Sequence, residues 1–382
     1  MKIVYCLNSI RYLGGIQRVT VTKANALADV PGNEVYVVVT DNKVGVSVQP
    51  LSPKVHLIDL EINHYDGDTE RSAFGDLLVS IHKRRLHKKR LEEFLLNLRP
   101  DIVISVGTSE KYMLLSMKNR TWKVIREFHF ERFYRKKYAV TRFDRLMASL
   151  ADFYEFHFKI KKYDKIVLLT HEDREDNWHN WSKTAVITNA ISFTCENPSS
   201  LDEKFVSMVG RLDPVKNCES MIRAFNMVAK RHPDWTLRLY GDGSEREKLQ
   251  RLIADLGLQG NVELMGFTKD VRAAFSKSSI ACLSSLCEGF ALVIIEAMEC
   301  GVPFVSYQCP CGPRDLITEG VDGFLVPVND EETMANRICQ LIEDEELRKT
   351  MGHAAKEKAR NYHIDNITKQ WMTLFNEVIN EK

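Results

Sequence analysis

Short apolar runs alternate along the chain with longer segments in which apolar residues recur at helical spacing. Runs such as KIVYCLN (2–8) and FVSMVG (205–210) are almost continuously apolar, which is typical of parallel strands buried on both faces. Segments such as CESMIRAFNMVAKRH (218–232) place apolar residues on one helical face. This alternation predicts right-handed βαβ units and doubly wound sheets. The expected strands are 2–8, 34–40, 55–60, 101–107, 123–128, 165–170 and 185–190, followed by 205–210, 235–241, 261–267, 279–285, 303–307 and 323–327.

The pattern restarts after the polar stretch NAISFTCENPSSLDEKF (189–205). A chain of 382 residues is too long for a single hydrophobic core, so we expect two Rossmann-like α/β domains, residues 1–190 and 191–362. The last helical segment, 363–382, has one apolar face, and we expect it to join the first domain. Because open sheets bind ligands at the carboxyl ends of their strands, two such domains facing one another would form a cleft.

The composition is that of a globular protein, with 44% hydrophobic and 27% charged residues. No stretch approaches the roughly 20 apolar residues of a membrane span, and the amino-terminal segment fits a first strand better than a signal peptide. The nine cysteines occur singly apart from Cys309-Pro-Cys311, without zinc-site spacing. These features predict a reduced, cytoplasmic protein without a bound metal.

The net charge of +1 conceals an asymmetry, since residues 1–190 carry +8 and the remainder −7. The positive excess lies mainly in 81–91, 131–138 and 159–165. Such clusters can lie against anionic lipid at the periphery of a membrane, or they can be solvated helix faces. No nucleic-acid-binding motif accompanies them. The apolar neighbours that could insert shallowly into lipid are Leu86, Leu91, Phe133 and Tyr134.

Two glutamates, Glu288 and Glu296, stand eight positions apart in the otherwise apolar stretch EGFALVIIEAM. We expect a strand (279–285), a turn and then a helix, an environment in which an unpaired carboxylate costs several kcal/mol. Carboxylates accept hydrogen bonds from paired hydroxyls such as those of ribose or a sugar ring. The backbone N–H groups at the start of the helix suit a phosphate; they belong to Gly289, Phe290, Ala291 and Leu292.

Other candidates follow neighbouring strands. Arg211 and Lys216, in GRLDPVKN, could hold a diphosphate and stabilise it as a leaving group; the alternative is two solvated basic residues in a loop. Small-residue turns also follow the next two strands, at Gly241 and at Gly266 with Phe267.

In the first domain, Gly14 and Gly15 lie between the first strand and a helix, where they permit close approach of the backbone to a ligand. The stretch lacks the GxGxxG of a dinucleotide site. His129 follows a strand and either faces the cleft or has a structural role among aromatic residues.

Together these motifs resemble family 4 of the retaining glycosyltransferases, the glycosyl transferases group 1, over essentially the whole chain. The resemblance is most specific in EGFALVIIEAMECGVPFVSYQCPCGPRDLITEGVDGFLV (288–326) and VGRLDPVKN (209–217). It implies the GT-B fold, two doubly wound domains facing a central cleft. Three positions depart from the family pattern: Ala291 replaces a glycine, Gln17 a glutamate that bears on acceptor recognition, and Asp315 a glutamate.

By position, the resemblance implies that Glu288 binds donor-sugar hydroxyls and Glu296 the nucleotide ribose. It implies that Arg211 and Lys216 neutralise the diphosphate and that the backbone of Phe290, Ala291 and Leu292 lies near sugar and phosphate. Gly15 would close on donor phosphate and acceptor, and His129 would lie on the acceptor side.

The function implied is transfer, with retention, from a nucleoside-diphosphate sugar (UDP-sugar favoured, GDP-sugar possible) to a saccharide or lipid-linked saccharide in surface polysaccharide synthesis. The resemblance implies no metal or other cofactor and no nucleic-acid partner. Two alternatives stay open: a sugar-nucleotide epimerase or phosphorylase of the same fold, and a non-catalytic partner subunit. The donor's base and sugar, the acceptor, the linkage formed and the oligomeric state are not specified by the sequence.

Overall fold

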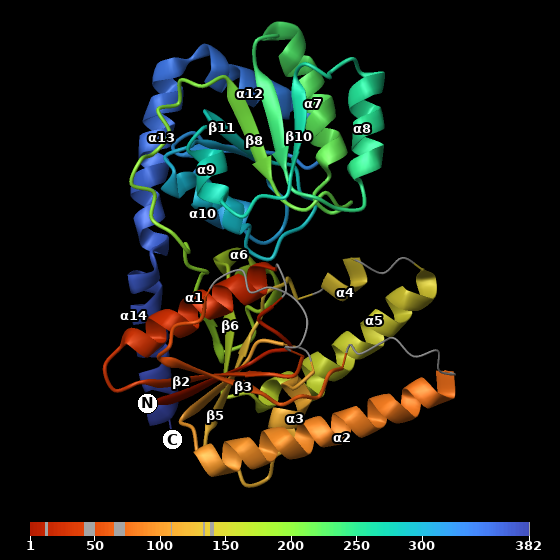
Figure 1. Cartoon of the computed structure of the whole chain (residues 1–382), viewed down its shortest axis with the longest axis vertical. Helices are drawn as coiled ribbons and strands as arrows, with labels where there is room; N and C mark the ends of the chain where they lie inside the picture. Colours follow the sequence, from red (N-terminus) through yellow and green to blue (C-terminus); the bar gives the residue numbers. More distant parts are fainter. Residues whose placement is uncertain are drawn as a thin grey trace. The chain divides into compact units, whose positions relative to one another are not determined.

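The computed structural model describes residues 1–11, 14–41, 50–64, 73–107, 109–132, 134–137 and 141–381 (Figure 1). The chain forms two compact units. Unit 1 comprises Met1–Leu168, Asn177–Ser192 and Ile364–Lys382, and unit 2 comprises Leu169–Asp176 and Phe193–His363. The chain passes from unit 1 to unit 2 after Ser192 and returns to unit 1 after His363, each within two residues of the expected boundary. The sequence pattern gives no indication that residues 169–176 group with unit 2.

Unit 1 contains a parallel sheet of seven strands in the order β3-β2-β1-β4-β5-β6-β7. Its elements are β1 (Lys2–Cys6), α1 (Gly15–Asp29), β2 (Glu34–Val39), β3 (Val55–Asp59), α2 (Ala73–Leu98), β4 (Ile102–Ser105), α3 (Lys111–Ser116), β5 (Lys123–Glu127), α4 (Tyr134–Lys137), α5 (Arg142–Tyr154), the π-helix η1 (Glu155–Lys159), the 3₁₀-helix η2 (Ile160–Lys162), β6 (Lys165–Leu168), β7 (Thr184–Val186) and α14 (Ile364–Asn380).

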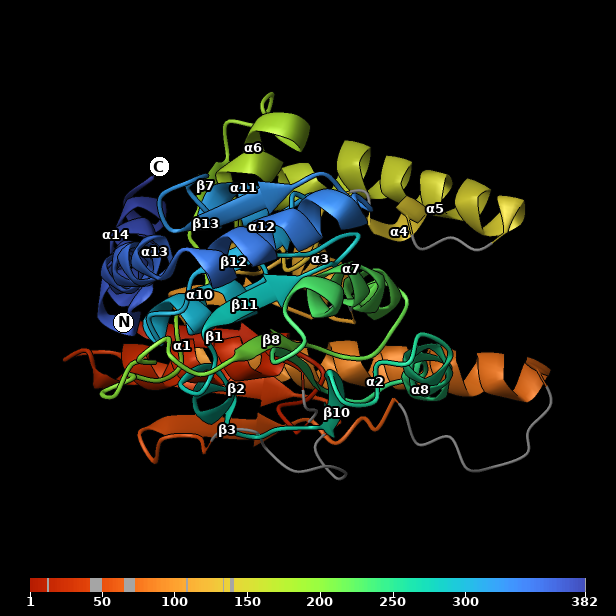
Figure 2. The ribbon, with the colours of Figure 1, turned by 90° about the horizontal axis from the view of Figure 1, so that it is seen from above.

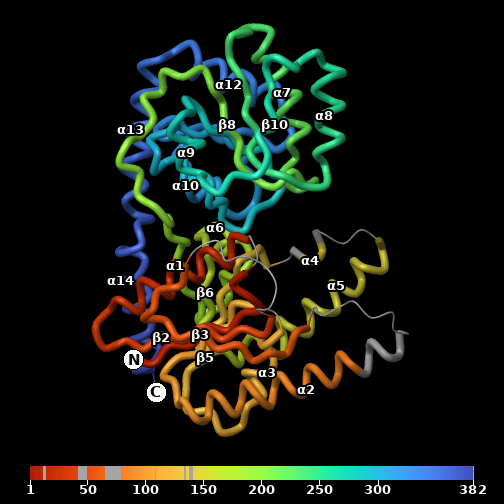
Figure 3. Tube along the Cα trace, viewed as in Figure 1, coloured from red at the N-terminus to blue at the C-terminus, as the bar shows by residue number. Residues whose placement is uncertain are grey.

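Both faces of this sheet are covered, which explains the continuous apolar runs. Ile3 and Tyr5 of β1 point into a core shared with α1 and α14, and Figure 3 shows these two helices side by side. Val4 and Cys6 point into a second core on the other face, with α2 and Trp178. The apolar face of α14 supplies Ile367, Trp371, Leu374, Phe375 and Val378, all buried in the first of these cores.

Unit 2 contains a parallel sheet of six strands in the order β10-β9-β8-β11-β12-β13. Its elements are α6 (His171–Asn177), whose last residue is grouped with unit 1, β8 (Phe205–Val209), α7 (Cys218–Arg231), β9 (Thr236–Tyr240), α8 (Arg246–Asp255), β10 (Val262–Gly266), α9 (Val271–Phe275), β11 (Ile280–Leu283), α10 (Leu292–Glu299), β12 (Phe304–Tyr307), α11 (Pro313–Leu316), β13 (Gly323–Val326), α12 (Glu331–Glu343), α13 (Glu345–Ala359) and the 3₁₀-helix η3 (Arg360–Tyr362).

The predicted fold class, two doubly wound α/β sheets, is confirmed. The expected strands are present with slightly shorter bounds, except the strand expected at 185–190, which is β7 (Thr184–Val186) and so shares only two residues with the expected range. Within the described part of the chain, no helix is long and apolar enough to cross a membrane.

Candidate functional site

The sheet of unit 2 reverses its direction of growth between β8 and β11. From β8 the chain continues to β9 and β10 on one side, whereas from β11 it continues to β12 and β13 on the other. The loops that leave these two strands therefore diverge, and open α/β sheets bind ligands in the crevice between such loops. Arg211 and Lys216 lie on the loop after β8, and Glu288 lies on the loop after β11.

Lys216 and Glu288 form an ion pair at this switch point. Lys216 Nζ lies 2.6 Å from Glu288 Oε1, and their side chains are only 18% and 10% exposed. Ser285 donates its hydroxyl to the same oxygen at 2.6 Å. Burial acts to lower the pKa of Lys216, but the adjacent carboxylate outweighs it and the pKa is raised. The predicted cation and the predicted acid are thus brought into contact.

Arg211 has a different partner. Its side chain is 77% exposed, and its guanidinium lies 2.9 Å from the carboxylate of Asp213. Asp213 also accepts the backbone N–H of Lys216 at 3.1 Å, so it orders the loop that carries both cations. The two predicted cations do not share a carboxylate in this structure.

Glycine is required at two positions in the loop after β9, because a side chain there would collide with the loop after β8. A Cβ on Gly241 would lie 1.8 Å from the carbonyl oxygen of Gly210, and one on Gly243 would lie 2.4 Å from that of Leu212. The loops after β8 and β9 therefore pack backbone against backbone. They are joined by a hydrogen bond from the Leu212 N–H to the Asp242 carbonyl at 3.0 Å.

The third turn continues this series. Gly241 donates its N–H to the carbonyl of Gly266 at 2.8 Å, which joins the loops after β9 and β10. Gly266 has a φ of +76°, a conformation that favours glycine. Phe267, which follows it, is 53% exposed.

The turn before α10 has an unusual backbone conformation. Ala291, the residue before the helix, has φ 60° and ψ 60°, in the left-handed region that normally takes glycine. Phe290 is buried and packs edge-on against Tyr362, with ring centroids 6.3 Å apart. Gly312 passes so close that a Cβ there would lie 2.6 Å from the Phe290 carbonyl oxygen. The first turn of α10, with Gly289 before it and Leu292 within it, is therefore held tightly by its neighbours.

Two acids of α10 are buried, and the sequence analysis assigned a role to only one. Glu296 is 1% exposed. Glu299, one turn later, accepts the backbone N–H of Cys195 at 2.9 Å and an ammonium hydrogen of Lys356 at 2.7 Å. Its second oxygen lies 2.8 Å from Nε2 of His363. Burial would raise the pKa of Glu299, but these hydrogen bonds outweigh it and lower the pKa. Glu299 has a structural role, and only its apolar surroundings could have indicated it.

Asp315, one of the departures from the family pattern, accepts the backbone N–H groups of His171 and Glu172 at the start of α6. Arg314 binds the Glu172 side chain. These contacts attach residues 169–176 to unit 2, which no sequence motif had suggested.

In unit 1 the corresponding switch point lies between β1 and β4, and it has a pocket of about 160 Å³. A Cβ on Gly14, before α1, would collide with the side-chain oxygen of Gln17. Gly15 begins α1 and is exposed. The pocket is lined by Leu7, Asn8, Ile16, Gln17, Val106, Gly107, Lys111, Arg126, Glu127, Phe128, His129, Phe130, Arg135 and Glu155.

His129 lies in this pocket beside a buried acid. Its Nε2 is 3.4 Å from Glu127 Oε1, and the side chain is 4% exposed. Burial lowers the pKa of His129 more than Glu127 raises it, so the imidazole is neutral at pH 7. Lys23 of α1 binds Glu127 and also lies over the ring of Trp371. His129 therefore lines the pocket of unit 1 and lies beside a buried carboxylate that Lys23 also binds.

A second charged network in the pocket was missed by the sequence analysis. Lys111 of α3 lies 2.8 Å from Glu155 of η1. Arg135 of α4 binds Glu155 at 2.5 Å and Asp152 of α5 at 2.8 Å. These residues come from four separate elements, so no local motif could have revealed them.

Only some of the residues in the basic clusters are exposed to solvent. Lys83 and Arg90 donate to the backbone carbonyls of Asn63 and Leu60, whereas Arg84, Arg85 and Lys89 are exposed. Leu91 is fully buried and Leu86 packs on the same core, so our expectation that these two leucines insert into lipid is wrong. Of the other expected contacts, Phe133 and the Tyr134 side chain lie outside the described residues.

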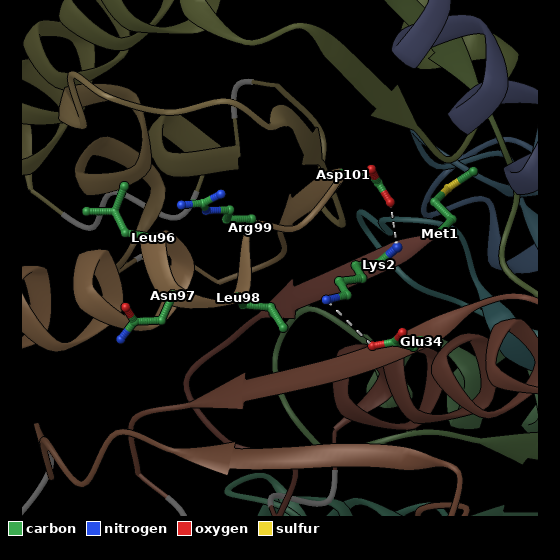
Figure 4. Close-up of a pocket in the computed structure, with 8 residues that line it drawn as sticks. All are labelled: Met1, Lys2, Glu34, Leu96, Asn97, Leu98, Arg99 and Asp101. Atoms are coloured by element: carbon green, nitrogen blue, oxygen red, sulfur yellow. Dashed lines mark hydrogen bonds and ion pairs between the residues drawn. The ribbon is translucent and has the colours of Figure 1, made fainter.

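A shallow hollow at the opposite end of the unit 1 sheet, at the amino ends of β1 and β2, is shown in Figure 4. The backbone N–H of Lys2 donates to Asp101 at 2.7 Å, and the Lys2 side chain lies 4.0 Å from Glu34. Parallel sheets bind ligands at their carboxyl ends, so this hollow is not a candidate site.

Comparison with known proteins identifies the family of the chain. The sequence model of the family described as Glycosyl transferases group 1 matches residues 194–358. An uncharacterized glycosyltransferase of Haemophilus influenzae is 30% identical over 379 residues, covering 97% of this chain and 98% of that protein. An exopolysaccharide phosphotransferase of Streptomyces coelicolor is 38% identical over 226 residues, but the match covers only 57% of this chain and 24% of that protein.

A third relative is GalNAc-α-(1→4)-GalNAc-α-(1→3)-diNAcBac-PP-undecaprenol α-1,4-N-acetyl-D-galactosaminyltransferase of Campylobacter jejuni. It is 27% identical over 386 residues, covering 100% of this chain and 99% of that protein. Among solved structures, TarM of S. aureus in complex with Fondaparinux, α-GlcNAc-glycerol and UDP superposes with a TM-score of 0.77 at 16% identity, covering 98% and 99% of the two chains. The chain belongs to the glycosyl transferases group 1 family and is a glycosyltransferase of the GT-B fold.

Proposed function

We propose that this protein transfers a sugar, with retention of configuration, from a nucleoside-diphosphate sugar to a saccharide or lipid-linked saccharide acceptor. The observation that carries the proposal is the Lys216–Glu288 pair with Ser285 at the switch point of unit 2. A cation and an acid in contact match the two halves of the donor, since the diphosphate needs positive charge and the sugar needs hydrogen-bond acceptors.

In this proposal Lys216 leaves Glu288 for the diphosphate and stabilises the charge that develops on it as it departs. Arg211 adds a second positive charge, because its exposed side chain is free to swing from Asp213. The N–H groups of the turn before α10 and of its first residue (Gly289 to Leu292) complete the phosphate site. Positive charge from these groups takes the place of a metal ion, so we propose that no metal or other cofactor is required.

Glu288 and Glu296 have the hydroxyl-binding roles. Glu288, released from Lys216, accepts hydrogen bonds from the donor sugar, and Glu296 accepts them from the ribose. We propose that donor and acceptor react on the same face of the sugar and that the leaving phosphate takes the acceptor proton. The turns at Gly241 and Gly266 with Phe267 extend the donor-binding surface, and Gly15 at the start of α1 contacts donor phosphate.

We propose UDP-sugar as the preferred donor and a lipid-linked saccharide as the leading acceptor. The TarM structure contains UDP, and the C. jejuni relative is named for a PP-undecaprenol acceptor and an N-acetylgalactosaminyl group. On the acceptor side, the pocket of unit 1 offers the neutral imidazole of His129 together with Lys111 and Arg135. The exposed basic residues of α2 support contact with anionic membrane.

The test is incubation of the purified protein with a panel of UDP- and GDP-sugars, measuring release of nucleoside diphosphate with and without saccharide acceptors. Lys216→Ala should lower turnover about 10²–10³-fold, and Arg211→Ala should also lower it, because each removes charge that stabilises the transition state. The matched control is Arg223→Ala, which replaces a partly exposed arginine of α7 bound to Glu219. This variant should leave turnover unchanged.

The outcomes separate the alternatives. Interconversion of sugar nucleotides without diphosphate release would indicate an epimerase, and dependence on inorganic phosphate would indicate a phosphorylase. Binding of a sugar nucleotide without turnover under any condition would indicate a non-catalytic subunit. Unchanged turnover in both cation variants would contradict the proposed diphosphate site.

A further inference from the structure

Helix α5 of unit 1 exposes its apolar face to solvent. Its large hydrophobic residues recur at spacings of three and four, which places them along one side of the helix and of η1 that follows. Among the described residues of unit 1, most of the large exposed hydrophobic side chains lie in this segment. The residues, with their exposed fractions, are Phe143 (69%), Leu146 (57%), Met147 (49%), Leu150 (54%), Phe153 (55%), Tyr154 (47%) and Phe158 (56%).

The opposite side of the same segment is buried and carries acids. Asp152 and Glu155 are 4% and 3% exposed and bind Arg135, while Glu155 also binds Lys111. The helix therefore has its polarity reversed relative to an ordinary surface helix. It cannot roll to bury its apolar face without separating these ion pairs, which would leave buried charges without partners.

The charges around the apolar face are mainly positive. Arg142, Arg145, Lys161 and Lys162 are exposed, while Asp144 is the single exposed acid of residues 141–162. Asp144 is occupied in a capping box with Thr141. An apolar stripe bordered by lysine and arginine is the pattern of a helix that lies in the plane of an anionic membrane surface.

We propose that α5 and η1 form a membrane-docking surface, whose apolar stripe inserts shallowly into an anionic bilayer while its basic residues contact the headgroups. Figure 2 shows α5 extending away from the sheet of unit 1. A second copy of the chain is a poorer occupant, because two such faces would bring their positive charges together.

The docking surface also lies close to the proposed acceptor pocket, and the following inference about the acceptor rests on the proposed function. Glu155 lines the pocket of unit 1 that contains His129, whereas Tyr154, one position before it, and Phe158, three positions after it, face solvent. One short segment thus separates the pocket from the docking surface. Insertion of α5 holds the pocket at the level of the headgroups, where the diphosphate and saccharide of a lipid-linked acceptor lie.

The test is flotation of the full-length protein with phosphatidylcholine vesicles that contain or lack the anionic lipid phosphatidylglycerol. Wild type should float with the anionic vesicles. The variant Leu146→Gln/Leu150→Gln should bind at least about tenfold more weakly. The matched control is Leu57→Gln/Leu96→Gln, two leucines of unit 1 that are 39% and 40% exposed outside α5, and it should bind as wild type does. Circular dichroism and thermal melting verify that both variants fold.

A second measurement tests insertion directly. In a Phe143→Trp variant, acyl chains brominated near the headgroup should quench the added fluorescence. Absence of wild-type flotation, equal flotation of the two leucine variants, or no quenching would overturn the proposal. A vesicle-independent dimer that is lost in Leu146→Gln/Leu150→Gln would also overturn it, in favour of a contact between copies.

The two proposals fail separately. Diphosphate release with a water-soluble saccharide acceptor should be unchanged in Leu146→Gln/Leu150→Gln, whereas transfer to a lipid-linked acceptor in vesicles should fall with binding. Flotation without any donor turnover would contradict the proposed function and leave the docking surface intact.

Discussion

Lys216 Nζ and Glu288 Oε1 lie 2.6 Å apart across the switch point of the second sheet, on loops separated by about seventy residues of sequence. The residues proposed to bind opposite halves of the donor thus bind each other in this structure. Each holds the other's side chain in place, and in the proposed mechanism the donor replaces that contact with its own.

Because the pair is largely buried, Lys216→Met and Glu288→Gln should each lower the free energy of unfolding by about 1–3 kcal/mol, since each leaves an unpaired group. The double variant should lose less than the sum of the two, with a coupling of about 0.5–3 kcal/mol. Urea denaturation of all four proteins measures this. Strict additivity would show that the contact contributes nothing to stability.

The two glutamates should differ in ligand binding. Glu296→Gln should weaken binding of free UDP about tenfold, because the carboxylate is proposed to hold ribose and a hydrogen bond to a charged group contributes about 1.5–3 kcal/mol. Glu288→Gln should spare UDP but depress sugar transfer. Isothermal titration with UDP distinguishes them, and an equal loss of affinity in both would refute the assignment.

Ala291→Gly should stabilise the protein, by about 0.5–1 kcal/mol, because Ala291 has a φ of 60° that costs an L-residue energy. The control is Ala254→Gly, on an exposed position of α8, which should destabilise by about 1 kcal/mol. Thermal and urea unfolding give both values. The same sign for the two substitutions would mean that the backbone at 291 is not strained.

Acid should destabilise unit 1 through His87. Burial, with a further contribution from His64, lowers the pKa of His87 to about 4, against 6.5 in the unfolded chain. As pH falls from 6.5 to 4 the unfolded state takes up the proton and the folded state does not, so stability falls, by at most about 3 kcal/mol. His87→Gln should flatten this part of the pH profile, whereas the exposed His353→Gln should leave it unchanged. A profile unaffected by His87→Gln would contradict the shift.

Chelation should not affect turnover. Since positive side chains and the α10 amino terminus are proposed to stabilise the leaving diphosphate, donor consumption in excess EDTA should equal that of the untreated enzyme. Loss of activity that Mg²⁺ or Mn²⁺ restores would require a metal in the mechanism.

Strand positions could be predicted from the sequence because a strand buried on both faces is a continuous run of apolar residues. Every residue of β4 and β11, for example, is buried, and such runs are visible without knowing their neighbours. Lys216 and Glu288 were predicted as site residues for a related reason, since both lie on loops that follow strands of the second sheet, β8 and β11. Their mutual contact was not predicted, because it depends on the order of strands in the sheet.

Other features could not be predicted from the neighbouring residues in the sequence. The stripe Phe143, Leu146, Leu150 has the spacing of an ordinary buried helix face, and only the ion pairs of Asp152 and Glu155 reverse its orientation. Glu299 is one more acid in a helix until Lys356 and His363 are placed beside it. The orientation of α5 and the burial of Glu299 both depend on contacts with residues on other elements.

The three groups bound by Glu299 give a rule for shortening the chain. The family match ends at residue 358, yet His363 binds Glu299 and Tyr362 packs on Phe290. A fragment cut at the end of the match would lose one of the partners of a fully buried carboxylate, together with the aromatic support of the turn before α10. Unit 2 expressed by itself should therefore extend through His363, and a fragment ending at 358 should be less stable and bind nucleotide more weakly.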